Sequence, residues 1–527
     1  MKIRFFLLIP VFLFIFLIGR SQIDLNGPLT SAYAMLRRAD LRAKLPPQSC
    51  AVIFSGGYDQ FSRSGIVPRR FSPSPNFFYL TGLEIPDGVL LIFSEPQKLE
   101  DGEYQEILFV PDQSDLALRY TGDAYAGEFG KQTGGWVLRP ASQWRKYCIE
   151  TLGLGNLNRI LALPLEPANF RKPGELAYAD LGSILFENLS PGFAFAPAAQ
   201  RFYQQIKQVD SAGVHALILK VNAYLDYFPG IPRDPVLDAF THVDGPRALG
   251  KVQAQVAAIK VDLILLDQIM AEMRQVKTQR ELKILRKSAD ILSDAVRVAA
   301  AAVAAGSKEY QVAAEAASVL GKSGAELAMP LRVASGPRSA LPYYNRNRET
   351  IPQSGFVVVD FAAKLDGYCT RLSRTLPAGG KFSAGQKQIY DMLLSIHQTA
   401  LAECKPGAKP STIANKALPG FDTFFSKLAL ATNRSGKSKV VRSVNISPIG
   451  LDLNELPNPS SLAVGMVLEL ETAIYIPGNS RINAKWRNTG IVLRDVIEIT
   501  ASGPVVLTKG VGWTTAKVET MMGGTGK

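Results

Sequence analysis

The chain has 527 residues, of which 47% are hydrophobic and 20% are charged, and its formal net charge is +13. This length predicts two or three domains, and the composition excludes a fibrous or intrinsically disordered chain. The excess positive charge either favours anionic surfaces, such as lipid head groups or envelope polymers, or is a solvated surface excess. No run of lysine and arginine is interleaved with aromatic residues, so we expect no nucleic-acid partner.

The first 21 residues have the pattern of an export signal. Two basic residues precede an uninterrupted apolar run over residues 5–19, and the small residues Gly19 and Ser21 occupy the −3 and −1 positions of a potential cleavage site before Gln22. The run is shorter than the roughly 20 residues of a membrane span. An uncleaved membrane anchor stays an alternative because Arg20 weakens the cleavage site. We therefore expect an exported protein, in the periplasm or cell envelope or secreted.

The four cysteines do not have the spacing of a metal site, and they are too few for a disulfide scaffold. We expect small buried thiols, although one pair could form a bridge in an oxidising compartment. These residues are Cys50, Cys148, Cys369 and Cys404.

Strands and helices alternate in the first part of the chain, which predicts a small α/β domain over residues 30–189. A helix is expected over residues 31–44 and strands over 50–55, 88–93 and 105–110. Residues 190–270 have helical spacing of apolar residues instead, with Pro229-Gly230 and Pro232 as breaks. We expect a largely helical insertion or connector there, whose last helix covers residues 246–273.

Residues 271–515 are expected to form a second domain, followed by a tail at 516–527. A long helix precedes Gly306, which suits the position just after a helix C-terminus, and another helix is expected over 384–404. Between them, residues 356–377 (FVVVDFAAKLDGYCTRLSRTLP) have the pattern of a β-hairpin with Asp366-Gly367 as its two-residue turn.

This turn sets the register of the hairpin. It places Asp360 opposite Ser373 and puts Arg371 on the same face as Asp360, as a diagonal neighbour within reach of an ion pair. A buried carboxylate on a central strand needs a partner, and the usual partners are a metal ion or an arginine.

The hairpin and several other segments resemble the aminopeptidase P / creatinase / methionine aminopeptidase superfamily, whose catalytic domain has the "pita-bread" fold. Together they cover most of residues 31–190 and 271–520, in the order and spacing of that family. They are 76–82 (NFFYLTG), 274–282 (RQVKTQREL), 356–377, 444–455 (VNISPIGLDLNE), 464–476 (VGMVLELETAIYI), 490–500 (GIVLRDVIEIT) and Leu507-Thr508, with Arg119–Gly122 in place of a W-x-G turn.

The resemblance implies an α/β (α+β) protein with a creatinase-like N-terminal α/β domain and a C-terminal pita-bread domain, in which helices flank a curved antiparallel sheet. It also implies a dimer or a larger homo- or hetero-oligomer. Active members hold two divalent metals, such as manganese, zinc or cobalt, between two Asp, one His and two Glu. These metals make bound water a nucleophile near neutral pH, and the bond before proline is cleaved.

By this resemblance the chain retains only part of that metal site. Asp360 and Glu471 match two of the ligands, whereas the other three ligands and two assisting histidines are substituted. The substituted ligand positions are Arg371, Ser447 and Arg494, and the substituted histidine positions are Tyr343 and Asn454. The three histidines of the chain lie outside these motifs and are expected to be ordinary surface or core residues: His215, His242 and His397.

The substitutions reverse the charge of the site. Arg371 and Arg494 would repel a divalent cation and would pair instead with the two remaining carboxylates. We therefore expect no metal cofactor and a salt-bridged core in its place. The alternative is a single metal at Asp360, Glu471 and Glu469, which shares the strand face of Glu471.

Three functions are compatible with these residues. The favoured one is an exported, catalytically inactive pseudopeptidase that binds a peptide or a protein partner. The second is an active Xaa-Pro metallo-aminopeptidase with two divalent metals. The third is a metal-independent hydrolase of the creatinase type, which the absence of histidine from the motifs disfavours.

Overall fold

The structure is a computed structural model that describes residues 31–56, 71, 73–99, 101–111, 136–153, 155–163, 178–189, 197–227, 233–427, 440–455, 457–480 and 482–523. The expected signal at 1–21, the Arg119–Gly122 turn, the breaks at Pro229-Gly230 and Pro232, and the end of the tail lie outside these residues. Within the described ranges, no helix combines the length and the apolar character needed to cross a membrane.

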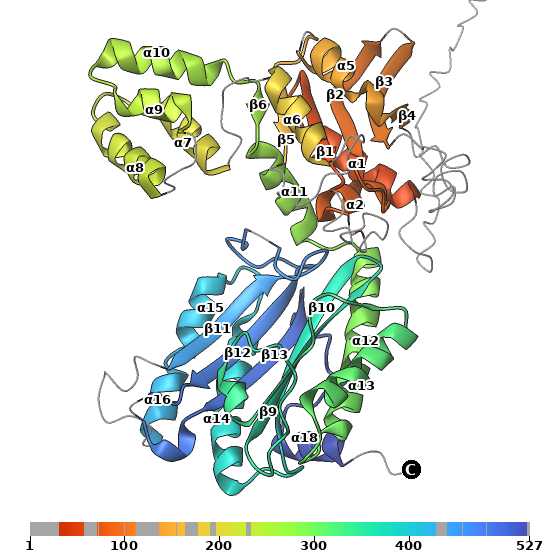
Figure 1. Cartoon of the computed structure of the whole chain (residues 1–527), viewed down its shortest axis with the longest axis vertical. Coiled ribbons are helices and arrows are strands. Elements are labelled where there is room, and N and C mark those ends of the chain that lie inside the picture. The colour runs from red at the N-terminus through yellow and green to blue at the C-terminus, as the bar shows by residue number, and fades with distance from the viewer. Residues whose placement is uncertain are drawn as a thin grey trace, which may run out of the picture.

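The N-terminal domain is built on a six-stranded mixed sheet in the order β4-β3-β2-β1-β5-β6. Strand β1 is buried along its whole length, because apolar side chains cover both faces of the sheet at this strand. Figure 1 shows this domain above the C-terminal one. Its elements are α1 (Ser31–Lys44), β1 (Ser49–Phe54), α2 (Pro75–Thr81), β2 (Val89–Leu99), β3 (Gly102–Val110), β4 (Val137–Pro140), α5 (Trp144–Tyr147), β5 (Arg159–Ala162), α6 (Tyr178–Leu189) and β6 (Val261–Asp262), with short helical turns η1 (Ala141–Gln143) and η2 (Cys148–Gly153).

Four helices lie between α6 and β6 and project to one side of this sheet (Figure 1). They have a hydrophobic core of their own. The expected single helix over 246–273 is wrong, because β6 interrupts it and pairs in parallel with β5. The insertion therefore leaves the N-terminal sheet and returns to it. The helices are α7 (Pro197–Gln208), α8 (Val214–Tyr227), α9 (Pro235–Thr241) and α10 (Pro246–Ala257), and α11 (Leu265–Gln275) follows β6.

The C-terminal domain contains an eight-stranded sheet whose main order is β11-β12-β13-β10-β9-β7, with β8 on β9 and β14 on β13. Helices flank it on both sides in the view of Figure 1. Its strands are β7 (Glu326–Leu327), β8 (Arg332–Ser335), β9 (Phe356–Leu365), β10 (Tyr368–Pro377), β11 (Val441–Pro448), β12 (Val467–Ile476), β13 (Thr489–Thr500) and β14 (Gly503–Val506). Its helices are α12 (Gln279–Ala302), α13 (Glu309–Lys322), α14 (Ala384–Glu403), α15 (Pro410–Ala417), α16 (Gly420–Lys427) and α18 (Thr515–Met522), with turns η3 (Gly336–Ala340) and η4 (Ala484–Trp486).

Local sequence explains where α12 begins. Thr278 and Glu281 form a capping box, in which each side chain bonds to the backbone N–H of the other residue.

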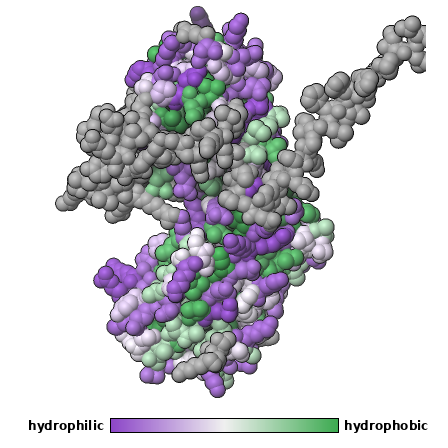
Figure 2. Space-filling view, turned by 90° about the vertical axis from the view of Figure 1, so that its right-hand side faces the viewer, coloured by the Kyte–Doolittle hydropathy of each residue, from purple (hydrophilic) through white to green (hydrophobic). Residues whose placement is uncertain are grey.

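On the face of the molecule in Figure 2, hydrophilic and hydrophobic residues are interspersed over the C-terminal domain. The large apolar side chains are instead concentrated in a core between the helices and the sheet.

The predicted hairpin is confirmed residue by residue. Strands β9 and β10 pair antiparallel, Asp360 lies opposite Ser373, and the turn residues Asp366 and Gly367 both have positive φ, at 45° and 84°. Two consecutive left-handed residues are what a two-residue hairpin turn needs to match the twist of its strands.

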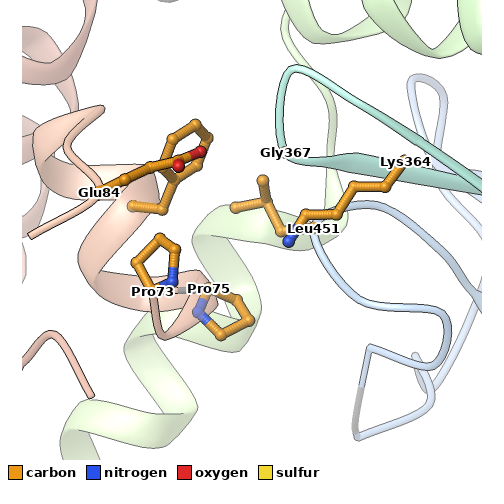
Figure 3. Close-up of a pocket in the computed structure, with 7 residues that line it drawn as sticks. Pro73, Pro75, Glu84, Lys364, Gly367 and Leu451 are labelled. Atoms are coloured by element: carbon orange, nitrogen blue, oxygen red, sulfur yellow. The ribbon is translucent and has the colours of Figure 1, made fainter. Parts of the chain in front are cut away.

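The tip of this hairpin contacts the N-terminal domain. A Cβ atom at Gly367 would lie 2.4 Å from Cε1 of Phe78 in α2, so only glycine fits against that ring. Figure 3 shows the small cavity beside this contact, with Glu84 on one side and Lys364 and Leu451 on the other. Its volume is about 20 Å³, which is room for about one water molecule.

An ion-pair cluster, buried except for Asp452, stabilises the same junction. Arg274 at the end of α11 donates to Asn76 of α2 at 2.9 Å and to Asp452 and Glu455 of the C-terminal domain at 3.1 and 2.8 Å. Lys277 also pairs with Glu455. Burial would raise the pKa of Glu455, but Lys277 and Arg274 outweigh it and hold that pKa below its usual value.

We predict that Gly367→Ala destabilises the protein more than a matched glycine substitution. Gly407 has a similar φ of 85° but has no neighbour within 4 Å of an added Cβ, so Gly407→Ala costs only the left-handed strain of about 1–2 kcal/mol. Gly367→Ala should cost about 1–3 kcal/mol more because Phe78 must move. Urea denaturation measures both variants. Equal costs would contradict the contact, and Phe78→Ala should remove the difference.

Candidate functional site

A row of polar side chains crosses one face of the C-terminal sheet, and the strand register produces it. Asp360 lies opposite Ser373, Ser373 opposite Arg494, Arg494 opposite Glu471, and Glu471 opposite Asn445. Because directly opposed residues point to the same face, five strands contribute one residue each to this row. Four of its members are buried, and Asn445 at the edge is exposed.

Asp360 is the most heavily bonded carboxylate of the row. Arg371 donates to it through Nε at 3.0 Å and through Nη2 at 2.8 Å, Ser373 donates at 2.7 Å, and Nη1 of Arg494 donates at 2.8 Å. Burial alone would raise the pKa of Asp360. The guanidinium groups of Arg494 and Arg371 outweigh that effect and hold the pKa well below its usual value. The diagonal ion pair expected from the sequence is therefore present.

Arg494 lies at the centre of the site, among three carboxylates. Its Nη1 bonds to Asp360, its Nη2 bonds to Glu471, and its Nε lies 2.7 Å from Oε1 of Glu469. All four side chains are less than 10% exposed. The guanidinium group therefore fills the space between the carboxylates, where its planar arrangement of donors suits several acceptors at once.

The outer side of the row is hydrogen bonded to β11. Oε1 of Glu471 accepts from Ser443 at 2.9 Å and from the Asn445 amide at 3.3 Å. Ser447, which the sequence resemblance aligns with a histidine ligand, lies directly opposite Glu469 in the strand register. The structure thus brings Ser447 beside the two glutamates.

Two of the sequence-predicted positions do not share this face of the sheet. Tyr343 is 94% exposed, and Asn454 is exposed in the segment that follows Gly450. The other predicted positions are brought together on one face, namely Asp360, Arg371, Ser447, Glu469, Glu471 and Arg494.

Sequence reasoning missed a third arginine. Arg332 of β8 is 3% exposed and lies opposite Asp360 in the register, with its Nη1 4.0 Å from Oδ2 of that carboxylate. It also donates to the carbonyl of Leu341 at 2.8 Å. A four-residue strand that pairs on the far side of the hairpin carries too little pattern to fix its register. Only the chemistry of a buried arginine, which needs a carboxylate, could have pointed to it.

The charges of this cluster balance. Three guanidinium groups, from Arg332, Arg371 and Arg494, face three carboxylates, from Asp360, Glu469 and Glu471. In the part of the chain that the structure describes, no group of three or more His, Cys, Asp or Glu side chains is arranged to hold a metal ion. The donor set does not fit two divalent metals, because their positive charge would be added to a cluster that is already neutral.

The histidines do not contribute to this face. His215 and His242 are exposed, and His397 is buried on the opposite face of the sheet, where its Nε2 lies 3.2 Å from Asp495. Asp495 follows Arg494 in β13 and therefore points the other way. It also accepts hydrogen bonds from Arg374 at 2.7 Å, Thr508 at 2.6 Å and Trp513 at 3.0 Å.

Comparisons with known proteins agree with this architecture. Residues 34–142 match the family model of the aminopeptidase P N-terminal domain, and residues 283–501 match that of metallopeptidase family M24. Aminopeptidase P from Escherichia coli with the inhibitor Pro-Leu has a similar structure, with a TM-score of 0.70 over 94% of this chain and 99% of that chain at 21% identity. The predicted fold class is confirmed.

Curated relatives are similar at low identity. Intermediate cleaving peptidase 55 of Saccharomyces cerevisiae is 24% identical over 90% of this chain and 81% of that protein. A Xaa-Pro dipeptidase of Pyrococcus horikoshii is 30% identical over 46% of this chain, and the Xaa-Pro aminopeptidase of Escherichia coli is 25% identical over 48%. The matches span 65% and 60% of those two proteins, less than two thirds of their length.

We predict that Arg494→Met is among the most destabilising substitutions in this domain. It leaves three buried carboxylates without their shared partner, and such changes cost about 3–5 kcal/mol in the free energy of unfolding. Arg371→Met should cost less, because its side chain is 23% exposed and water can replace it. Urea denaturation measures both. Glu469→Gln with Glu471→Gln should partly rescue Arg494→Met, and a failure to rescue would contradict the shared pairing.

We also predict that stability falls in acid through Asp360. Its pKa is lower in the folded than in the unfolded protein, so the unfolded chain binds the proton more tightly. The contribution is therefore complete above the usual Asp pKa of about 4 and is lost as the pH falls below it. Asp360→Asn should flatten the slope of unfolding free energy against pH between about pH 5 and pH 2. If this variant kept the parent slope of unfolding free energy against pH, the ion pairs of Asp360 would not contribute to the loss of stability in acid.

Proposed function

We propose that this chain, in which an M24-type domain follows an aminopeptidase P N-terminal domain, is a pseudopeptidase that binds a peptide or a protein partner without a metal cofactor. The observation that carries the proposal is the position of Arg494 between Asp360, Glu469 and Glu471. In that position the arginine supplies the positive charge that the carboxylates need.

Charge makes this arrangement resistant to metal entry. A unit charge about 4 Å from a fixed guanidinium group is repelled by about 4 kcal/mol at an effective dielectric constant near 20, and a divalent ion by twice that. Arg371 and Arg332 add to this repulsion. A metal ion would first have to displace Arg494 from three buried ion pairs.

Arg371 gives the same site a means of binding. Two of its five N–H donors point at Asp360, and we find no other acceptor for it within the described residues. Its side chain is 23% exposed, unlike the buried Arg494. Arg371 can therefore donate to a carbonyl or carboxylate of a bound peptide while it remains paired with Asp360.

The alternative function is an active, metal-dependent Xaa-Pro aminopeptidase. It requires two divalent metals, or one metal at Asp360, Glu469 and Glu471, and in either case the arginines must swing out. The peptidase names of the relatives favour this function. The arginines that pair with Asp360, Glu469 and Glu471 argue against it, because those carboxylates would have to bind the metal.

We also propose export and assembly for this protein. Residues 1–21 have the composition of an export signal or an anchor, and the net charge of +13 suits an anionic envelope surface. A homo-oligomer, or a hetero-oligomer with an active paralogue, would provide the protein partner.

The deciding experiment measures bound metal and peptidase activity on the same purified sample. We expect less than about 0.1 metal per chain by elemental mass spectrometry and no cleavage of a Xaa-Pro peptide after addition of Mn²⁺. The Escherichia coli Xaa-Pro aminopeptidase serves as the positive control for the assay. One or two metals per chain together with turnover would support the alternative function and exclude the pseudopeptidase.

A triple variant tests whether the substituted residues are the reason that the chain does not bind metal. Arg371→Asp, Ser447→His and Arg494→Glu together would restore the carboxylate and imidazole donors that divalent metals prefer. We expect this triple variant to bind metal when the parent chain does not. Metal binding by neither protein would mean that the arginines alone do not exclude it.

A further inference from the structure

A cavity of about 560 Å³ lies at the end of the C-terminal sheet where β9 and β13 begin. Its walls come from η3, the segment that leads into β9, the first turn of α14, and η4 with the residues that lead into β13. None of the charged residues of the Arg494 row lines it. Its volume is within the range of small-molecule sites, about 300–1,000 Å³.

One part of the wall is apolar and aromatic. Trp486 of η4 is 6% exposed, and a Cβ at Gly385 would lie 3.3 Å from the outer edge of its indole ring, so the ring packs on the first turn of α14. Phe356, Pro337 and Pro352 complete this part of the wall. The indole Nε1 is buried, and within the described residues it has no hydrogen-bond acceptor. Because this nitrogen is buried by the protein itself, the indole offers a ligand an apolar surface and not a hydrogen-bond donor.

The other part of the wall is positively charged. Lys485 and Arg487 line the cavity, and no acidic side chain does so among the described residues. Neither cation forms an ion pair with a described carboxylate, although many other cations of this protein do. Nε of Arg487 donates to the carbonyl of Ile482 at 3.2 Å, which orients the guanidinium group. Nζ of Lys485 lies 5.0 Å from the centre of the Trp486 ring.

Part of the remaining polar wall is already hydrogen bonded within the fold. Gln386 donates to the carbonyl of Gly355 at 2.8 Å, and Ser383 caps α14. Ser339 accepts from the backbone N–H of Gly490 at 3.0 Å. These bonds connect the segments that form the wall. The side chains of Lys485 and Arg487, and the polar side chains of Ser354 and Asn488, stay available to a ligand.

We propose that this cavity binds a small amphipathic anion. An aromatic or apolar body would lie against Trp486 and Phe356, and an oxyanion, either a carboxylate or a phosphate, would bond to Lys485 and Arg487. Arginine presents a planar fork to such oxyanions, and lysine adds a point charge beside it. The site is separate from the Arg494 row, so it does not rest on the proposed function.

Calorimetric titration of the whole protein tests this with three probes that share a phenyl ring and differ in charge: phenyl phosphate, benzoate and benzyl alcohol. We expect one or both anions to bind at least about tenfold more tightly than the alcohol, because each charge-assisted hydrogen bond contributes that much or more. The order of the two anions distinguishes a phosphate ligand from a carboxylate ligand. Binding should weaken with salt, because the two cations are exposed.

The double variant Lys485→Gln, Arg487→Gln should lose at least about tenfold in affinity for the anion. Its matched control is Lys207→Gln, Lys251→Gln, which removes the same charge from exposed positions of the helical insertion. Circular dichroism checks that both variants are folded. The proposal would be overturned if the two double variants bound the anion equally, whether or not both had lost affinity. It would also be overturned if benzyl alcohol bound more tightly than either anion, or if the parent protein bound no anion.

Discussion

The contact of one guanidinium group with three buried carboxylates links strands on both sides of β13 in the C-terminal sheet. Arg494 of β13 reaches Asp360 of β9 on one side and Glu469 and Glu471 of β12 on the other. Buried charges are tolerated only when their partners are in place, so each of these side chains depends on the others. The space between these carboxylates is occupied by the Arg494 guanidinium group.

Both faces of β13 carry a buried charge that is neutralised by its neighbours, and the two charges have opposite sign. On one face an arginine is surrounded by carboxylates, and on the other Asp495 is surrounded by Arg374, His397, Thr508 and Trp513. Adjacent residues of one strand therefore connect two ion-pair clusters through the sheet. Burial would raise the pKa of Asp495, but Arg374 and His397 hold it below its usual value. The strand is thus fixed by electrostatics from both sides.

Sequence alone predicted the parts that depend on local chemistry. Asp366-Gly367 determined the hairpin turn and so the register that brings Asp360 to Arg371. The sequence could not show that Arg332 joins them, because a four-residue strand with no tight turn connecting it to the hairpin has no register signal. It also missed β6, since two residues that pair in a sheet leave no periodic pattern. The 560 Å³ cavity was hidden for a similar reason, because four separate segments form it.

The balance of three guanidinium groups and three carboxylates has an evolutionary consequence. Replacing Arg494 alone by a carboxylate would put four acidic side chains against Arg332 and Arg371, and the fold would lose its central cation before any metal could bind. Replacing Arg371 alone would leave Arg494 in the space that a metal needs. Each single replacement is therefore unfavourable while the other members of the cluster are unchanged. The six side chains are coupled, so we expect substitutions among them to be tolerated in compensating groups and not one at a time.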